Sequence, residues 1–324
     1  MIQVESYNSF DSDEWRSLIK AVGGNVFHLQ EIWLAENNPG SICYLVLRND
    51  KDIIGACIGV RQEKRYLKLF RSSGALYLPT VPAISDAGQG IKDHIYESLL
   101  SFAVKSGFDF LKIGVRWGTD LSHNPRLNKF IDGHLIEFTI GLKDDMDTIK
   151  SSFHKKHRKN IRKACENDIE IVTDNSLDGL MMLKRLQESS SERASTKGNV
   201  YNIQNETYFI ELYEHIYKKK LGNIIFARKD QTYVAGLAYL FFNNKAITVR
   251  SGVLPEGYVI SAPYYLQYEL IRQLKEKRYE IINIGGVPED ASNPSHPQHG
   301  LYQFKKGFGT DANIRTGLRI PTRR

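Results

Sequence analysis

A lysine set among aromatic residues near the end of the chain is the strongest candidate for chemistry. Residues 300–309 read GLYQFKKGFG, and they follow an apolar run, residues 281–287, that contains a pair of glycines. The run predicts a buried strand, and the glycine pair predicts a close approach of the backbone to another group. Residues 302–308 alternate like a strand, with Tyr302 and Phe304 on one face and Lys305 on the other. Lys305 is therefore a candidate for a partly desolvated cation, and a solvated lysine on a β-hairpin is the alternative.

The densest positive charge lies in residues 150–164, KSSFHKKHRKNIRKA. At helical spacing its apolar stripe consists of Phe153, His157, Ile161 and Ala164. Its candidate phosphate-binding cations are Lys155, Arg158, Lys159 and Arg162. Basic side chains four residues apart suit the repeated charges of a polyanion, whereas a solvated surface helix is the simpler explanation. The histidines of this segment lack further ligands at metal spacing, so we expect no metal.

The elements that must position these residues occur twice in the same order. In each half the patterns predict a hairpin, a further strand, a helix and a last strand. We therefore predict two copies of one α/β unit, with a boundary near residues 143–145, and one large mixed sheet is the alternative. Residues 314–324 contain too few apolar side chains to fold alone, so we expect them to pack on one of the domains.

Composition and charge narrow the class of protein. Of 324 residues, 41% are apolar and 25% are charged, which are ordinary values for a globular protein. The apolar runs are too short to span a membrane, and the first residues lack a signal-peptide pattern. Three scattered cysteines without a CxxC pair fit a reducing cytoplasm. The net charge of +7 permits an anionic partner such as tRNA, a nucleotide-linked substrate or a membrane surface. We expect neither DNA binding nor stable membrane insertion.

Residues 153–164, FHKKHRKNIRKA, resemble the basic helix that opens the second domain of FemABX proteins. These proteins are aminoacyl-tRNA-dependent peptidyltransferases that build peptidoglycan cross-bridges. Further resemblances follow in the family's order at residues 205–209, 234–236, 250–252, 262–264, 284–286 and 301–308, and the first half adds residues 27–33. The resemblance implies an α/β (α+β) fold of two tandem GNAT-like domains, each a mixed twisted sheet flanked by helices. It assigns residues 1–143 plus 313–324 to the first domain and residues 144–312 to the second.

The resemblance also implies an acyltransferase that forms an amide on a cell-envelope precursor, using aminoacyl-tRNA and no cofactor. Lys305 would be the catalytic cation that stabilises the tetrahedral oxyanion. The residues that would bind substrate are Arg250, Tyr208, Gln204, Tyr302, Phe304 and Tyr264. Two positions depart from the compact relatives, because residues 34–37, LAEN, lack a diphosphate-binding lysine and Gln204 replaces a phosphate-binding arginine. The acceptor therefore stays open.

Two other functions are compatible with the residues. A GNAT-type N-acyltransferase would use acyl-CoA or acyl carrier protein, and CoA requires a glycine-rich loop whose amides hold the pyrophosphate. Residues 253–263 offer one glycine and place Pro263, which has no amide hydrogen, at a helix start, whereas residues 88–90, GQG, imitate such a loop better. A non-catalytic RNA-binding module would keep the basic helix but would not need Lys305.

Overall fold

The computed structural model describes residues 2–64, 73–85, 92–117, 127–196, 198 and 202–322. Its contacts divide the chain into two units, Met1–Leu135 with Ile314–Arg324, and Ile136–Asn313. The chain passes between the units within strands β7 (Ile131–Gly141) and β13 (Asp311–Pro321). The first unit therefore ends at Leu135 rather than at Lys143. The GQG sequence at residues 88–90 lies outside the described residues.

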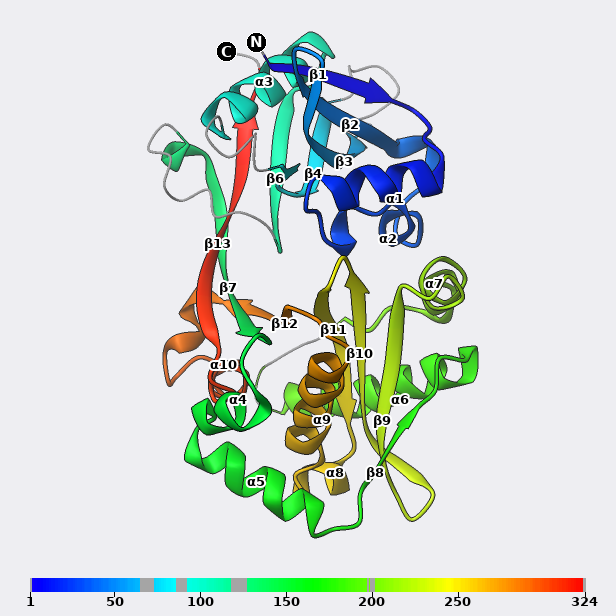
Figure 1. The fold of residues 1–324 in the computed structure, drawn as a ribbon, viewed down its shortest axis with the longest axis vertical. Coiled ribbons are helices and arrows are strands. Elements are labelled where there is room, and N and C mark those ends of the chain that lie inside the picture. Colours follow the sequence, from blue (N-terminus) through cyan, green and yellow to red (C-terminus); the bar gives the residue numbers. More distant parts are fainter. Residues whose placement is uncertain are drawn as a thin grey trace. The chain divides into compact units, whose positions relative to one another are not determined.

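The first unit is built on one mixed sheet (Figure 1). Its strands lie in the order β1 (Ile2–Tyr7), β2 (Ile42–Asn49), β3 (Asp52–Lys64), β4 (Ser73–Thr80), β6 (Phe110–Arg116) and β13, and β5 (Ala83–Ile84) pairs with β3. Its helices are α1 (Ser12–Ala21), α2 (Gln30–Leu34) and α3 (Lys92–Lys105). The last strand, β13, pairs antiparallel with β6 from Leu318↔Ile113 to Pro321↔Phe110, and Leu318 and Ile320 join the buried core. The end of the chain thus packs on a sheet, as its composition requires.

The strands of the second unit follow in the same 13-stranded order of the described residues, as β7, β12 (Ile281–Pro288), β11 (Lys245–Val253), β10 (Thr232–Phe242), β9 (Gly222–Lys229) and β8 (Glu170–Thr173), so the predicted alternative of one large mixed sheet holds for the strand order. Its helices are α4 (Met146–Ser152), α5 (Lys155–Cys165), α6 (Leu177–Ser195), α7 (Glu206–Leu212), α8 (Pro255–Val259), α9 (Ala262–Glu276) and α10 (His299–Lys306), and a π-helical turn spans Tyr213–Tyr217.

Helices cover both faces of the sheet in the second unit. Helix α9 packs against β9, β10 and α5, while α6 packs against β10 and β11. The two faces alternate along β10: Ala235 and Leu237 belong to the core beneath α9, whereas Gly236 between them faces Leu186 of α6. This alternation is the period of a strand that is buried on both sides.

The two units repeat one topology. In each, an antiparallel hairpin (β2–β3 or β9–β10) turns at a residue with positive φ, Asp50 at 54° or Asp230 at 47°. A further strand, a helix and a last strand follow, and that last strand is parallel to the further strand (β4 with β6, β11 with β12). The repeat predicted from the sequence is confirmed in this order of elements.

Two predicted elements have a different form. The prediction of a strand over residues 302–308 is wrong, because α10 carries them as a helix to Lys306. Residues four apart, Phe304 and Phe308, meet with ring centroids 5.2 Å apart, a spacing that a helix provides and a strand does not. The basic segment forms two helices, α4 and α5, because Phe153 leaves the helical path to enter the core and His154 starts the next helix by accepting a hydrogen bond from the Lys156 amide.

Gly252 provides a test of the packing of α6 on β11. A Cβ at this position would overlap the backbone of Leu186 and Gln187, which cannot rotate away. We expect Gly252→Ala to lower the stability of the second unit by about 1–3 kcal/mol, the usual cost of overpacking, as measured by urea unfolding. The matched control is Gly141→Ala, since a Cβ at Gly141 meets nothing within 4 Å. Equal unfolding midpoints for the two variants would contradict this packing.

Candidate active site around Lys305

Lys305 lies where two parallel strands separate. Strands β11 and β12 pair from Lys245↔Ile281 to Ile247↔Asn283, and both continue beyond this point as they part (Figure 1). Beyond the last paired residues of β12, the Nζ of Lys305 donates a hydrogen bond of 3.0 Å to the carbonyl of Gly286. A Cβ on Gly285 would lie 2.8 Å from that Nζ and 3.5 Å from the carbonyl oxygen of Thr248 on β11. The missing side chain of Gly285 therefore leaves the space that the lysine amine occupies.

Asn283 fixes the backbone that receives Lys305. Its Oδ1 accepts a hydrogen bond of 2.7 Å from the Gly285 amide, and Gly285 has a φ of 82°, in the left-handed region that favours glycine. An amide N–H can only donate, so the side-chain atom facing it must be the oxygen. The bond holds Gly285 in its turn and so orients the next carbonyl, that of Gly286, toward Lys305. The Nδ2 of Asn283 is buried and has no hydrogen-bond partner.

The electrostatic environment of Lys305 lowers the proton affinity of its amine. Burial lowers the pKa of Lys305 to about 8, and the carboxylate of Glu137 partly opposes this shift. Glu137 is 3% exposed and lies on β7 among apolar neighbours. No motif of the sequence identifies Glu137, although an acidic residue in the mostly apolar strand of residues 135–142 is a signal of a buried, partnered carboxylate. Together these groups make a cation that is neither fully solvated nor paired tightly.

The N-terminal end of α5 caps the C-terminal end of α10, the helix that carries Lys305. The Nε2 of His157 lies 2.8 Å from the carbonyl oxygen of Phe304, and the amide of His154 donates to the carbonyl of Gly307 at 2.8 Å. Since a carbonyl only accepts, Nε2 must carry the proton, and the buried Nδ1 has no hydrogen-bond partner. These carbonyls are among the groups that a helix end leaves without intrahelical partners. The basic helix therefore holds the catalytic candidate in place.

Aromatic rings surround the His157 side chain. Its ring centroid is 4.9 Å from that of Tyr264 and 4.8 Å from that of Phe308, both in edge-on contact. A side chain at Gly307 would overlap the imidazole, which explains the glycine there. Burial lowers the pKa of His157, and the nearby charges of His154 and Lys156 act in the same direction. The imidazole is therefore neutral at pH 7. The neutral tautomer that carries its proton on Nε2 can still donate the hydrogen bond to the Phe304 carbonyl.

Tyr302 and Phe304 do not line one common wall. Phe304 packs against Tyr264, with centroids 5.1 Å apart, beside His157. Tyr302 instead meets Phe138 of β7 at 5.6 Å and stacks on His299. Residues two apart in a helix point to different sides, whereas in the predicted strand they would have shared a face. The pairing of Tyr302 with Phe304 was therefore wrong for the same reason as the strand.

A second polar group joins β11 to α7. The Nη2 of Arg250 donates to the hydroxyl of Tyr208 at 2.7 Å, and the guanidinium lies over the rings of Tyr208 and Phe209 at 5.0 and 5.4 Å. Both Arg250 and Tyr208 are half-buried, so part of the guanidinium fork is open to a ligand. Gln204 is exposed in the segment before α7, and no described contact joins it to this pair. Arg250 follows Thr248, the residue beside Gly285, by two positions on β11.

The basic residues of α5 divide into two groups. Lys155, Lys159 and Arg162 are exposed, and none of them takes part in the ion pairs of the described residues. Arg158 instead donates to the carbonyls of Ser151 and Phe153 at 2.7 and 2.6 Å, so it caps the end of α4. Three of the four predicted phosphate-binding cations thus form the exposed basic face of α5, while Arg158 has a structural partner. Within the described part of the chain no cluster of residues is arranged to hold a metal.

The environment of His157 predicts a pH-dependent stability. Because its pKa is lowered in the folded state, the unfolded chain binds the proton more readily, and stability is lost as the pH falls through about 6.5. The slope from this one group is at most about 1.4 kcal/mol per pH unit. Urea unfolding at pH 7.5 and 5.5 should show a smaller loss in His157→Gln than in the wild type. Substitution of the exposed His94 by Gln is the control, and an unchanged loss in His157→Gln would contradict the assignment.

The environment of Lys305 predicts its titration. We expect its amine to titrate near pH 8, and Glu137→Gln to lower this pKa further, because the carboxylate favours the ammonium form. Nuclear magnetic resonance of the lysine side chains over pH 6–11 measures this directly, with the Lys305 signal identified by its loss in Lys305→Arg. A Lys305 titration unchanged from the free amino acid would exclude the desolvated site.

Comparisons with known proteins bear on this geometry. The model of the FemAB family matches residues 216–317, which include Arg250, Asn283, Gly285 and Lys305. No curated protein matches the chain. The matched residues include three of the segments that resemble FemABX proteins, at residues 250–252, 284–286 and 301–308. The family match indicates an acyl- or aminoacyltransferase, as predicted from the sequence.

Solved structures share the fold over nearly the whole chain. FemX is 13% identical with a TM-score of 0.75, over 98% of this chain and 97% of its own. L-PGS from Bacillus licheniformis is 14% identical with a TM-score of 0.55, over 97% and 93%. A tandem GNAT protein from the clavulanic acid biosynthesis pathway is 11% identical with a TM-score of 0.52, over 100% and 99%. The predicted GNAT-like fold is therefore confirmed. The resemblance to FemABX proteins is confirmed as well: residues 216–317 match the FemAB family, within a chain that has the fold of FemX.

Proposed function

We propose that this protein transfers the aminoacyl group of an aminoacyl-tRNA to an amine of a cell-envelope precursor of the peptidoglycan type. The amine attacks the ester carbonyl, the carbon–nitrogen bond of the amide forms, and the bond between the carbonyl carbon and the ribose oxygen breaks. The proton released by the amine ends on the ribose oxygen. Because the ester is already activated, the protein needs mainly to orient the two substrates and to stabilise the oxyanion. The reaction would take place in the cytoplasm, where tRNA is charged.

The observation that carries this proposal is the Lys305 amine at the separation of β11 and β12. With a pKa of about 8 the amine is protonated about ten to one at pH 7, so it can stabilise a developing negative charge. Its one described hydrogen-bond partner is the neutral Gly286 carbonyl, which leaves further N–H donors for an oxyanion. A preorganised donor in a partly desolvated place contributes more to such stabilisation than a solvated one.

The exposed basic face of α5 supports tRNA as the donor. Lys155, Lys159 and Arg162 follow one another at spacings of four and three residues, which suits phosphates along a backbone. Helix α5 also caps α10 through His157 and His154, so the proposed phosphate contacts lie on the helix that positions Lys305. Acyl-CoA would need free backbone amides at the start of a helix to bind its pyrophosphate. Helix α9 is a poor candidate, because it begins with Ala262 and Pro263, and proline has no amide hydrogen.

The Arg250–Tyr208 pair supports an acceptor that carries a negative charge. The guanidinium donates to the Tyr208 hydroxyl through Nη2 and keeps other N–H groups for a phosphate or carboxylate. The rings of Tyr208 and Phe209, over which the guanidinium lies, hold its orientation without neutralising its charge. We therefore assign the acceptor to this pair and to Gln204, which is exposed four residues before Tyr208.

The reaction can be tested with transfer of labelled amino acids from a mixed pool of charged tRNA to a cell-wall precursor extract. We expect a product whose formation is sensitive to ribonuclease. Lys305→Ala should reduce the rate on the order of a hundredfold or more, because it removes the cation that stabilises the transition state. The matched control is Lys306→Ala, which removes an exposed cation one residue away, on the ring of Tyr302, and should keep the wild-type rate.

Three other results would contradict the proposal. Activity that resists ribonuclease and appears with acyl-CoA or acyl carrier protein would identify a different acyl donor. Equal losses in the Lys305→Ala and Lys306→Ala variants would show that local charge, rather than the desolvated amine, matters. RNA binding without transfer, unchanged by Lys305→Ala, would identify a binding module.

A further inference from the structure

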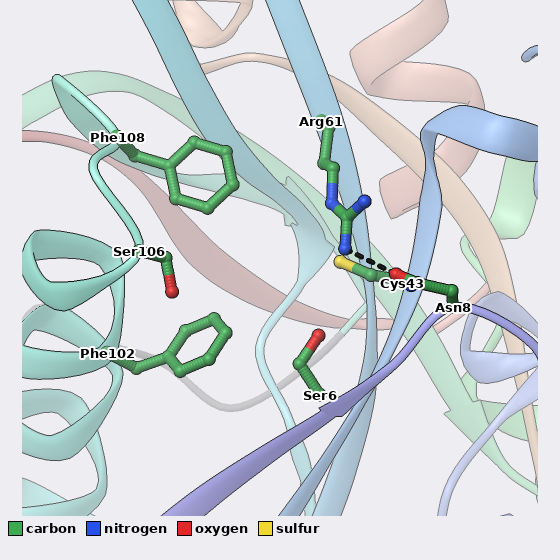
Figure 2. Close-up of a pocket in the computed structure, with 7 residues that line it drawn as sticks. All are labelled: Ser6, Asn8, Cys43, Arg61, Phe102, Ser106 and Phe108. Atoms are coloured by element: carbon green, nitrogen blue, oxygen red, sulfur yellow. Dashed lines mark hydrogen bonds between the residues drawn. The ribbon is translucent and has the colours of Figure 1, made fainter.

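A cavity of about 510 Å³ lies in the first unit, and none of the site residues described above lines it. Figure 2 shows its lining side chains pointing into one space, namely those of Ser6, Asn8, Cys43, Arg61, Phe102, Ser106 and Phe108. Its volume is within the range of small-molecule binding sites. The buried Cys43 forms its floor, while the exposed Ser6, Asn8 and Ser106 leave it open to solvent.

The fold brings these residues together from the sheet and from α3. Cys43 on β2 is the cross-strand partner of Gly59 on β3, and Arg61 follows two residues later on the same strand. Phe102 and Ser106 are one helical turn apart, at the end of α3 and just after it, so they share a face. The turn at Gly107, with a φ of 78°, reverses the chain and returns Phe108 to the same cavity.

Arg61 gives the cavity a positive charge. Its Nη2 donates to the amide oxygen of Asn8 at 2.7 Å, a neutral partner, and the lining residues that the structure describes include no carboxylate. Burial raises the pKa of the Cys43 thiol, so this group stays neutral at pH 7. Other arginines of the same unit are paired differently, because Arg48 binds Glu5 at 3.0 Å. A guanidinium whose described partners, the Asn8 amide and the Cys43 thiol, are both neutral keeps other donors for a bound anion.

The opposite wall of the cavity is apolar. The rings of Phe102 and Phe108 project from the α3 side toward Arg61 (Figure 2), and both are half-buried. Ring faces accept a planar or aromatic group, which makes a flat apolar body a suitable occupant. A ligand that also carried an ammonium group would find no acidic partner for that cation among the described lining residues.

We propose that this cavity binds a small organic monoanion, with its carboxylate on Arg61 and its planar apolar body against Phe102 and Phe108. The ligand class excludes amino acids in their zwitterionic form and neutral amides of the same shape. This site belongs to the first unit alone and is independent of the reaction proposed for the second.

The test uses three probes of one shape: 3-phenylpropionate, its neutral amide 3-phenylpropanamide, and phenylalanine, which adds an ammonium group. Calorimetric titration of the full chain should give a dissociation constant on the order of 1 mM or tighter for 3-phenylpropionate, the range expected of a small fragment. The amide and phenylalanine should bind at least tenfold more weakly. Absence of binding by 3-phenylpropionate at 10 mM overturns the proposal, and so does equal binding of the acid and its amide.

Two variants with a matched control locate the site. Arg61→Gln should weaken 3-phenylpropionate binding at least tenfold, and Phe102→Leu should weaken it several-fold. Arg48→Gln is the control, since that guanidinium is already paired with Glu5 and lies outside the cavity lining, so binding should be unchanged. Thermal unfolding of the ligand-free variants verifies that each is folded. Equal weakening by Arg48→Gln and Arg61→Gln would show a non-specific charge effect and overturn the assignment.

Discussion

The hydrogen bond from Lys305 to the carbonyl of Gly286 is the interaction on which the arrangement of the second unit depends. It requires that β12 leave β11, because a carbonyl engaged in a regular ladder faces its neighbouring strand. The side chain of Asn283 accepts the hydrogen bond of the Gly285 amide in place of a neighbouring strand. The missing side chain of Gly285 provides the space for the lysine amine. A partly buried ammonium with a neutral acceptor is costly, and the carboxylate of Glu137 offsets part of that cost. The unfavourable burial of a cation thus occurs at the place where the proposed chemistry needs one.

The second requirement is a fixed helix end. Helix α10 has eight residues, His299–Lys306, too few to hold its last turn rigidly by its own hydrogen bonds. Helix α5 supplies the missing donors from His157 and His154, and the positive end of its dipole meets the negative end of α10. One basic helix therefore serves two purposes: its buried face orders the helix that carries Lys305 and its exposed face carries the cations. A structural role and a phosphate-binding role are therefore not exclusive for α5, because they use different faces of the helix.

The order of the elements could be predicted from the sequence because periodicity, capping residues and turn residues agree. Asp11 begins α1 and Asp145 begins α4, each by accepting backbone N–H groups, as their positions indicate. The form of residues 302–308 could not be predicted, because alternation over so short a run fits a strand or one face of a helix, and only the packing of Phe304 and Phe308 decides.

Within the candidate site, Lys305, Arg250 and Tyr208 were predicted by type and motif, and the structure joins the last two directly. Glu137 and Asn283 could not be assigned, since their roles depend on contacts with residues far away in the sequence or on a local departure from the sheet. The same limit applies to Arg158, whose charge is visible in the sequence while its partners, two carbonyls at the end of α4, are not.

Three glycines in the second unit are each matched to one side chain: Gly285 to Lys305, Gly307 to His157 and Gly309 to Ser152. In each pair the partner occupies the volume that a Cβ would take. A larger residue at 307 therefore becomes acceptable only after His157 shrinks or turns away, whereas Gly309, with a φ of 65°, is required by its backbone conformation as well. The pair of Gly285 and Lys305 lacks this freedom, since the amine cannot retreat without losing the Gly286 carbonyl. Among related chains that keep the lysine, residue 285 should therefore vary less than residue 307, which can change together with residue 157.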